Sequence, residues 1–348
     1  MRFGPVPVAD AEGCLSAHAV RADGVTLKKG QVIERRHIEA LQAKGVASLV
    51  AVRLELGDIG EDEAAARIAA QVGGANVRAE EAFTGRANIF ATHAGVLLLD
   101  EPAIEALNSV DEAITLATLP PFRAVIAGEM VATVKIIPFA VTAAALTAAL
   151  AAAPRTPVRV AAYRPLRVGV ISTVLPGLKP ATIDKTLRVL ESRLDPAGAR
   201  IAAELRVPHE TAMVAAAISR VAQACDLVVV YGASAITDRR DVIPSALCAA
   251  GGRIDHFGMP VDPGNLLLLG RLADDKPVLG APGCARSPKE NGFDWVLQRL
   301  LADVPVDAAA IRRMGLGGLL MEIGSRPQPR AGAELGHVST VVGVLHDE

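Results

Sequence analysis

The chain has 348 residues, which is enough for two or three domains of ordinary size. Its 36 basic and 38 acidic residues nearly cancel to a formal net charge of −2, so no strong electrostatic field is expected and nucleic acid is disfavoured as a partner. Aromatic residues make up only 3% of the chain, which favours helices packed on sheets over an aromatic-rich β-sandwich. The composition therefore predicts an α/β protein.

The cysteines and the first ten residues indicate the cellular compartment of the protein. Cys14, Cys225, Cys248 and Cys284 show no CxxC spacing, and in a chain of this length they are expected as free thiols in a reducing compartment. Residues 1–10 are mixed and contain prolines, unlike a secretory signal. We therefore expect a cytoplasmic location.

One uncharged stretch approaches the length of a membrane span. Residues 136–153 contain no charged side chain, and such a stretch is near spanning length. It is mainly alanine, however, with an early Pro138 and two threonines, so its hydrophobicity is weak. We expect a strand end followed by an alanine-rich helix, and no membrane partner.

Two composition breaks divide the chain, one rich in proline and arginine and the other rich in glycine and proline. No internal repeat is visible. The breaks predict four parts: a mixed α+β region at 1–153, a linker at 154–165, an α/β domain at 166–305 and a tail at 306–348.

Short strands and helices are expected to alternate in the first part. Glu34–Lys44 has the pattern of a charged amphipathic helix, and Gly45 follows it as a common residue after a helix end. The other expected elements are a hairpin at 24–30, an extended stretch at 48–56, a helix from 61, and two strands within 125–137 joined at 128–129.

The pattern of the α/β part is clearer. Arg167–Thr173 and Asp226–Tyr231 are apolar runs typical of strands buried on both faces, and Thr182–Leu194 has helical spacing. Such alternation predicts a mainly parallel sheet with helices on both faces. Further helices are expected at 211–224, 242–250 and 292–302, and further strands at 199–207, 253–257, 266–269 and 276–279.

Three loops that follow strands of this sheet are candidates for the ligand site, because the ligand of such a sheet binds beyond the carboxyl ends of its strands. They cover residues 172–179, 232–241 and 280–289 and combine small residues, hydroxyls and a cation near a helix start. This chemistry suits an anion, since close backbone N–H groups and a helix N-terminus attract negative charge. The cations expected to pair with phosphate are Lys179, Arg286 and Lys289.

The acidic residues of these loops suit other ligands. Asp238 and Asp241 fit a Mg²⁺ ion or the N–H donor edge of a pterin-type ring. The loops match neither GxxxxGK[ST] nor GxGxxG, which disfavours an ordinary nucleoside triphosphatase and a dinucleotide enzyme. The alternative is structural: loops between strands and helices are small and polar in many α/β proteins.

The first part has a polar cluster of its own in the sequence EAFTGRAN, residues 81–88. Thr84, Arg86 and Asn88 are candidate ligand contacts, because Arg86 beside Gly85 is able to present a guanidinium fork. The alternative is an ordinary turn whose polar side chains have their hydrogen bonds satisfied within the protein.

The histidines give no sign of a nucleophilic triad. His93 and His256 are expected to be ordinary structural or surface residues. In the turn at 209–211 we expect the Thr211 hydroxyl to cap the following helix.

Several motifs of the α/β part occur in an order that is typical of a known fold. The strand Arg167–Thr173 is followed by the run Asp226–Ser234 and then by "RDV-x-P-x-A" at residues 240–246, and Pro282-Gly283 precedes the last helix. In this order they resemble the molybdopterin-binding fold shared by molybdopterin adenylyltransferases and molybdopterin molybdotransferases. In that family the Pro-Gly pair belongs to a "PGNP" type of loop.

Other stretches extend the resemblance beyond this domain. Gly24–Gly45 is similar to a stretch of molybdotransferases. EAFTGRAN at 81–88 and the stretch at 314–330, which contains MGLGGLLMEI and SRPQPR, are similar to the molybdopterin-binding half of bacterial proteins fused to a cytidylyltransferase-like domain. The LAAGxSxRMG signature of that second half does not occur in this sequence.

The resemblance implies binding of molybdopterin or the molybdenum cofactor in cofactor biosynthesis, with molybdate insertion or nucleotidyl activation as a transferase step. It implies a homo-oligomer and a molybdoenzyme or nucleotidyltransferase as partner. Asp241 is the implied catalytic residue and Mg²⁺ ligand. The ligand-binding residues are then expected to be Ser172, Thr173, Lys179, Gly232, Ala233, Ser234, Asp238, Arg240, Pro282, Gly283, Ser287 and Lys289, together with Thr84, Arg86 and Asn88.

The alternative is a carrier or binding module that delivers the cofactor without catalysing a step. Two acidic segments of the family are replaced here. Val174-Leu175-Pro176 stand in place of the "GDE" start after the first strand, and His209-Glu210 in place of the acidic pair before the second helix. Whether the chain is an enzyme therefore stays open at the level of the sequence.

Overall fold

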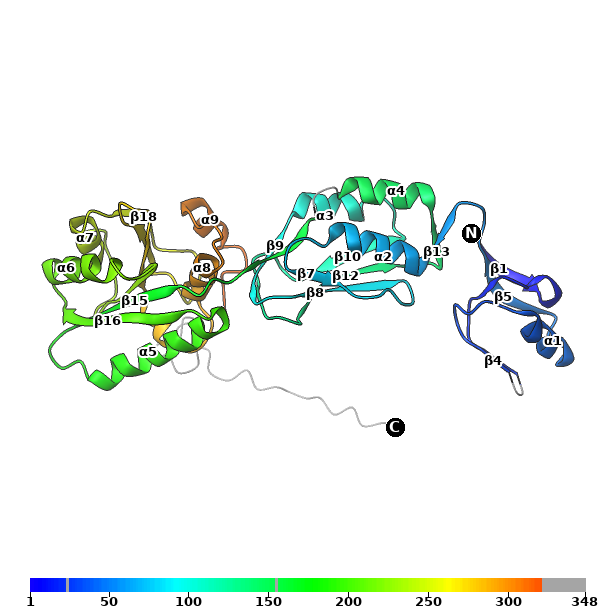
Figure 1. The fold of residues 1–348 in the computed structure, drawn as a ribbon, viewed down its shortest axis with the longest axis horizontal. Helices are drawn as coiled ribbons and strands as arrows, with labels where there is room; N and C mark the ends of the chain where they lie inside the picture. The colour runs from blue at the N-terminus through cyan, green and yellow to red at the C-terminus, as the bar shows by residue number, and fades with distance from the viewer. Residues whose placement is uncertain (23–24, 154–155, 321–348) are drawn as a thin grey trace, which may run out of the picture. The chain divides into compact units, whose positions relative to one another are not determined.

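A computed structural model describes the chain except for residues 23–24, 154–155 and 321–348 (Figure 1). The described chain divides into two compact units. The first comprises residues 1–166 with 194–200 and 297–305, and the second comprises residues 167–193, 201–296 and the described residues from Val306.

The N-terminal part of the first unit is a small sheet with one helix. β1 (Arg2–Pro7) and β2 (Leu15–Ser16) pair antiparallel with β5 (Ser48–Arg53). α1 (Arg35–Ala43) lies where the sequence predicted a helix. The stretch predicted as a hairpin contributes only one strand, β4 (Val25–Leu27). β4 pairs with β3 (Val20–Ala22), and residues 23–24 between them lie outside the described residues.

The rest of the first unit packs helices on a four-stranded antiparallel sheet. α2 (Glu61–Val72) begins where the sequence predicted a helix and buries Ile68 and Val72 in the core shared with the sheet. The sheet has the order β10 (Ile114–Thr118), β12 (Met130–Ile136), β8 (Arg86–Ala91) and β7 (Val77–Ala79). The remaining elements are β6 (Asp58–Gly60), β9 (Gly95–Leu99), α3 (Glu101–Asn108), β11 (Ala124–Val125), β13 (Ala140–Thr142), α4 (Ala143–Ala152) and β14 (Val158–Ala162).

The uncharged stretch 136–153 folds as the end of β12, the short β13 and the helix α4. Thr142 is the N-cap of α4, and its side chain accepts a hydrogen bond from the Ala145 N–H. Across the part of the chain that the structure describes, no helix is long and apolar enough to cross a membrane.

The second unit is built on a six-stranded sheet, ordered β16 (Arg200–Pro208), β15 (Arg167–Val174), β17 (Leu227–Tyr231), β20 (Pro277–Ala281), β19 (Leu268–Arg271) and β18 (Arg253–Phe257). β15, β17 and β20 run parallel, with Ser172 opposite Tyr231 and Tyr231 opposite Ala281. These strands are fully or nearly fully buried, which is why their sequences are continuous apolar runs. The predicted α/β fold is confirmed.

One strand near one side of the sheet, β19, runs opposite to its neighbours. β19 pairs antiparallel with both β18 and β20. Only residues 272–276 separate β19 from β20, and so short a connection turns the chain back, whereas a parallel return needs a crossover of a dozen or more residues. The sheet is therefore parallel at its centre and antiparallel at this side.

Helices cover both faces of this sheet (Figure 1). On one face, α6 (Thr211–Ala222) and α7 (Val242–Ala249) pack in one core with Ile171, Val228 and Val230. The opposite face bears α5 (Pro180–Leu194) and α8 (Gly292–Leu301), since the ring of Phe293 in α8 lies 6.4 Å from that of Tyr231. Near the end of the described chain lies α9 (Ala308–Arg313), capped by Asp307.

The predicted cap of α6 is wrong. Thr211 is the first residue of the helix, its N-cap is Glu210, and no side chain makes the capping hydrogen bond. The preceding His209 instead turns back to β15, where its ring contacts Thr173. A long-range contact thus fixes a turn that the local pattern assigned to a cap.

Candidate functional site

The candidate site lies at the carboxyl ends of β15, β17 and β20, the edge where ligands of parallel sheets bind. The Thr173 hydroxyl, near the end of β15, accepts a hydrogen bond from the Ala233 N–H at 2.7 Å and lies 2.8 Å from Nδ1 of His209. One side chain therefore ties the loop after β17 to the turn before α6. The structure brings Thr173 and Ala233 together, as a shared site requires.

Neighbouring residues of a strand point to opposite faces, and this separates two of the expected ligand contacts. Thr173 faces the side of α6 and α7. Ser172 faces the other side, next to its register partner Tyr231. The hydroxyls of Ser172 and Tyr231 are both buried and have no hydrogen-bond partner among the described residues. Burial raises the pKa of the Tyr231 phenol, so it stays protonated.

Arg286 joins the third loop to the second loop and to α5. It lies in the short 3-10 turn Gly283–Arg286 that follows β20. Its guanidinium donates to the carbonyl of Gly232 and to the hydroxyl of Thr186 in α5, both at 2.9 Å, and lies 5.5 Å from the centroid of the Tyr231 ring. Burial lowers the pKa of Arg286, although the group remains a cation at neutral pH.

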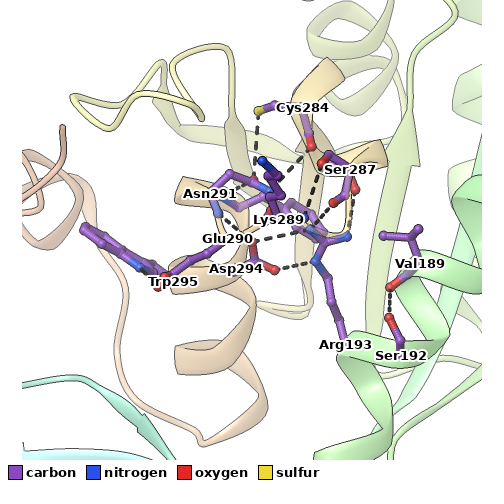
Figure 2. A network of polar contacts seen from close by, with 12 residues as sticks. Val189, Ser192, Arg193, Cys284, Ser287, Lys289, Glu290, Asn291, Asp294 and Trp295 are labelled. Atoms are coloured by element: carbon purple, nitrogen blue, oxygen red, sulfur yellow. Dashed lines mark hydrogen bonds and ion pairs between the residues drawn. The ribbon is translucent and has the colours of Figure 1, made fainter. Parts of the chain in front are cut away.

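A buried ion pair holds the third loop in place. Figure 2 shows Arg193 extending from α5 to Asp294 in α8, with which it forms a salt bridge. The same guanidinium donates to the carbonyls of Ala285 and Ser287 at 2.8 and 2.7 Å. Burial raises the pKa of Asp294, and hydrogen bonds from Arg193 and the backbone of Asn291 oppose that shift. The network fixes the backbone on both sides of Arg286.

The acidic residues expected at the site form a helix cap and an ion pair within the second loop and the start of α7. Asp241 is the N-cap of α7, and its two oxygens accept from the N–H groups of Val242 and Thr237 at 2.7 and 3.2 Å. Asp238 pairs with Arg240, whose hydrogen bonds lower the pKa of that carboxyl. Within the described residues, no group of three or more His, Cys, Asp or Glu side chains is arranged to hold a metal ion. The described side chains therefore give the expected Mg²⁺ no support.

Replacing Asp241 distinguishes capping from ligand binding. Asp241→Ala is expected to lower the free energy of unfolding by about 0.5–2 kcal/mol because α7 loses its cap, whereas Asp241→Asn keeps an N-cap acceptor and stays near wild type. Urea unfolding of both variants measures this. If the asparagine variant is as stable as wild type but binds a pterin more weakly, Asp241 contacts the ligand as the sequence predicted.

The remaining predicted residues of this domain lie on the three loops. Pro282 is the N-cap of the 3-10 turn, and the Ser287 hydroxyl accepts from the Lys289 N–H at 3.2 Å. These contacts do not test ligand binding, so the binding role of each residue stays a prediction. The exposed members of the set are Lys179, Ser234, Gly283 and Lys289.

The three candidates of the EAFTGRAN stretch belong to the first unit. Arg86 donates to the Thr133 hydroxyl at 3.2 Å, and that hydroxyl donates to Asn88 at 2.8 Å. Thr84 accepts from Lys135 through its carbonyl at 2.6 Å. Arg86 and Asn88 thus have side-chain partners within their own unit, Thr84 is contacted through its backbone carbonyl, and a ligand contact at any of the three stays a prediction.

The fold and these contacts define an α/β domain in which three strand-following loops meet at the carboxyl edge of the sheet. Residues 169–303 match the family described as "Probable molybdopterin binding domain", and residues 5–53 match a "Domain of unknown function (DUF8806)". The α/β domain therefore belongs to the molybdopterin-binding family, as the sequence resemblance predicted. This membership supports a role in molybdenum cofactor biosynthesis.

The whole chain has distant similarity to solved structures. A molybdopterin biosynthesis MoeA protein from Pyrococcus horikoshii is 16% identical, over 87% of this chain and 75% of that chain, with a TM-score of 0.31. A molybdenum cofactor biosynthesis protein from Pyrococcus furiosus is 12% identical, over 92% and 68%, with a TM-score of 0.26. No curated protein gave a significant match.

Proposed function

We propose that the second unit binds molybdopterin or a related pterin phosphate of the molybdenum cofactor at the carboxyl edge of its sheet. One observation carries the proposal: in a domain of the molybdopterin-binding family, a hydrogen bond from the Ala233 N–H to Thr173 and one from Arg286 to Gly232 gather three strand-following loops at that edge. Backbone N–H groups and helix starts in such loops suit the anionic part of a pterin phosphate.

The role we favour is that of a carrier or binding module, which holds the cofactor for a molybdoenzyme or a nucleotidyltransferase. Metal-assisted transfer would call for free carboxylate ligands, and the two carboxylates expected for it are engaged in a helix cap and an ion pair. Binding needs neither of them.

A transferase step is the second candidate. The exposed Lys179 and Lys289 stand near the starts of α5 and α8, where two further cations are available to a transferred anion. Molybdate insertion or nucleotidyl activation would place its second substrate there. Incubation of the pterin-loaded chain with molybdate or with nucleotide, followed by mass analysis of the released pterin, separates the two roles.

Binding itself is tested by titrating the purified chain with molybdopterin in EDTA and then in Mg²⁺. Retained pterin is measured, after oxidation, by its fluorescence. Thr173→Val keeps the shape but removes the hydroxyl that orders the loops, so we expect roughly tenfold weaker binding or more. Thr147→Val changes an exposed threonine of α4 in the first unit and is the matched control. If the wild-type chain retains no pterin, the proposal is wrong.

A further inference from the structure

Arg286 has hydrogen-bonding capacity that the protein does not use. A guanidinium carries five N–H donors, and the two bonds to Thr186 and Gly232 occupy one donor on each terminal nitrogen. The Tyr231 ring lies against the group and restricts its movement. The remaining donors belong to a fixed, planar fork of the kind that binds phosphate oxygens in pairs.

The charge of Arg286 is also uncompensated. Within the described residues, the group forms no ion pair with a carboxylate, although it is largely withdrawn from water. Arginines that are fully buried are almost always paired, because a desolvated charge without a counter-charge is costly, and Arg286 bears part of that cost. Arg193, on the same face of the sheet, shows the ordinary arrangement, since it is paired with Asp294. An anion from outside the chain would supply the missing partner of Arg286.

Two buried hydroxyls lie on the same face as Arg286. Tyr231 is 1% exposed and Ser172 is 2% exposed, and neither hydroxyl has a hydrogen-bond partner among the described residues. Buried hydroxyls are nearly always hydrogen-bonded, to protein, ordered water or a ligand. Two hydroxyls without hydrogen-bond partners therefore lie on the face of the sheet that bears Arg286. They are a second observation, separate from the charge of Arg286, that points to a ligand on this face.

We infer that Arg286, rather than a metal ion held by carboxylates of this chain, neutralises the anionic group of the ligand. The ligand class is a phosphate or pyrophosphate ester, and the inference rests on the proposed function. It gives the site a fixed cation at the edge where the expected carboxylate Asp241 is engaged as a helix cap. Binding by this site does not depend on Mg²⁺.

The first test uses inorganic pyrophosphate and molybdopterin as probes of the full-length chain in EDTA at physiological salt. The single tryptophan, Trp295, donates to Glu290 beside the third loop, so its fluorescence reports on binding there. Arg286→Met is expected to weaken both ligands by about tenfold or more, and Arg286→Lys by less, because lysine keeps the charge without the fork. Arg220→Met removes an exposed cation near the end of α6 and should bind as wild type.

The outcomes separate the inference from the function on which it rests. If molybdopterin binds wild type and Arg286→Met equally well, or binds wild type only with Mg²⁺, the inference falls and the proposed function stands. If pyrophosphate binding depends on Arg286 but molybdopterin does not bind, the anion site stands and the proposed function falls.

A second measurement avoids variants that fold poorly. Phenylglyoxal modifies arginines of the wild-type chain, and peptide mass analysis locates the modified residues. Pyrophosphate in EDTA should protect Arg286 and leave the modification of Arg220 unchanged. Equal modification of Arg286 with and without the ligand would overturn the inference.

Discussion

Asp294→Ala is expected to destabilise the second unit by about 3–5 kcal/mol, because it leaves the Arg193 guanidinium buried without its counter-charge. The two side chains are only 10% and 9% exposed, so water does not replace the lost partner. Urea unfolding followed by the fluorescence of Trp295 measures the change. The loss should appear as a lower midpoint with an unchanged denaturant slope.

The double variant Arg193→Met/Asp294→Leu is the control for this prediction. It removes both charges and fills the space with apolar side chains, so it should be clearly more stable than Asp294→Ala. The carbonyls of Ala285 and Ser287 would still lose their donor, which leaves the double variant somewhat below wild type. A single variant no less stable than the double would show that the salt bridge is not what holds this loop.

The ion pair also illustrates how far the sequence leads. The strands β15 and β17 and most helices of the second unit follow from local patterns, because strands buried on both faces need continuous apolar runs and helices need a regular apolar stripe. Their alternation predicted the sheet and the edge at which a ligand would lie. Those steps need only information carried by neighbouring residues.

Contacts between residues far apart in the chain leave no local pattern in the sequence. Arg193 and Asp294 are 101 positions apart, and Thr173 and His209 are 36 apart. Nothing in the sequence near Asp241 distinguishes a helix cap from a metal ligand, because aspartate is a preferred residue for both. The motif therefore located the loop, while the role of its carboxylate depended on which N–H groups the folded chain placed around it.

Gly169→Ala is expected to destabilise the second unit by about 1–3 kcal/mol, because the added methyl overpacks the interface between β15 and α6. A Cβ at this position would lie 1.9 Å from Cγ1 of Val221 and 3.1 Å from Sγ of Cys225, so α6 has to shift. Thr173, on the same strand, contacts the turn before this helix through His209. The variant should therefore also weaken ligand binding, which the pterin titration measures.

The physical cause is tested by removing the obstacle. Val221→Ala opens a cavity by itself, but combined with Gly169→Ala it provides room for the new methyl, so the double variant should lose less than the sum of the two single losses. Gly283→Ala is the matched control, since no atom lies within 4 Å of its Cβ position, and its stability should be unchanged or slightly higher. Simple additivity of Gly169→Ala and Val221→Ala would mean that crowding against α6 does not account for the glycine, and that the close fit of β15 to α6 is not what positions Thr173 and His209 at the site.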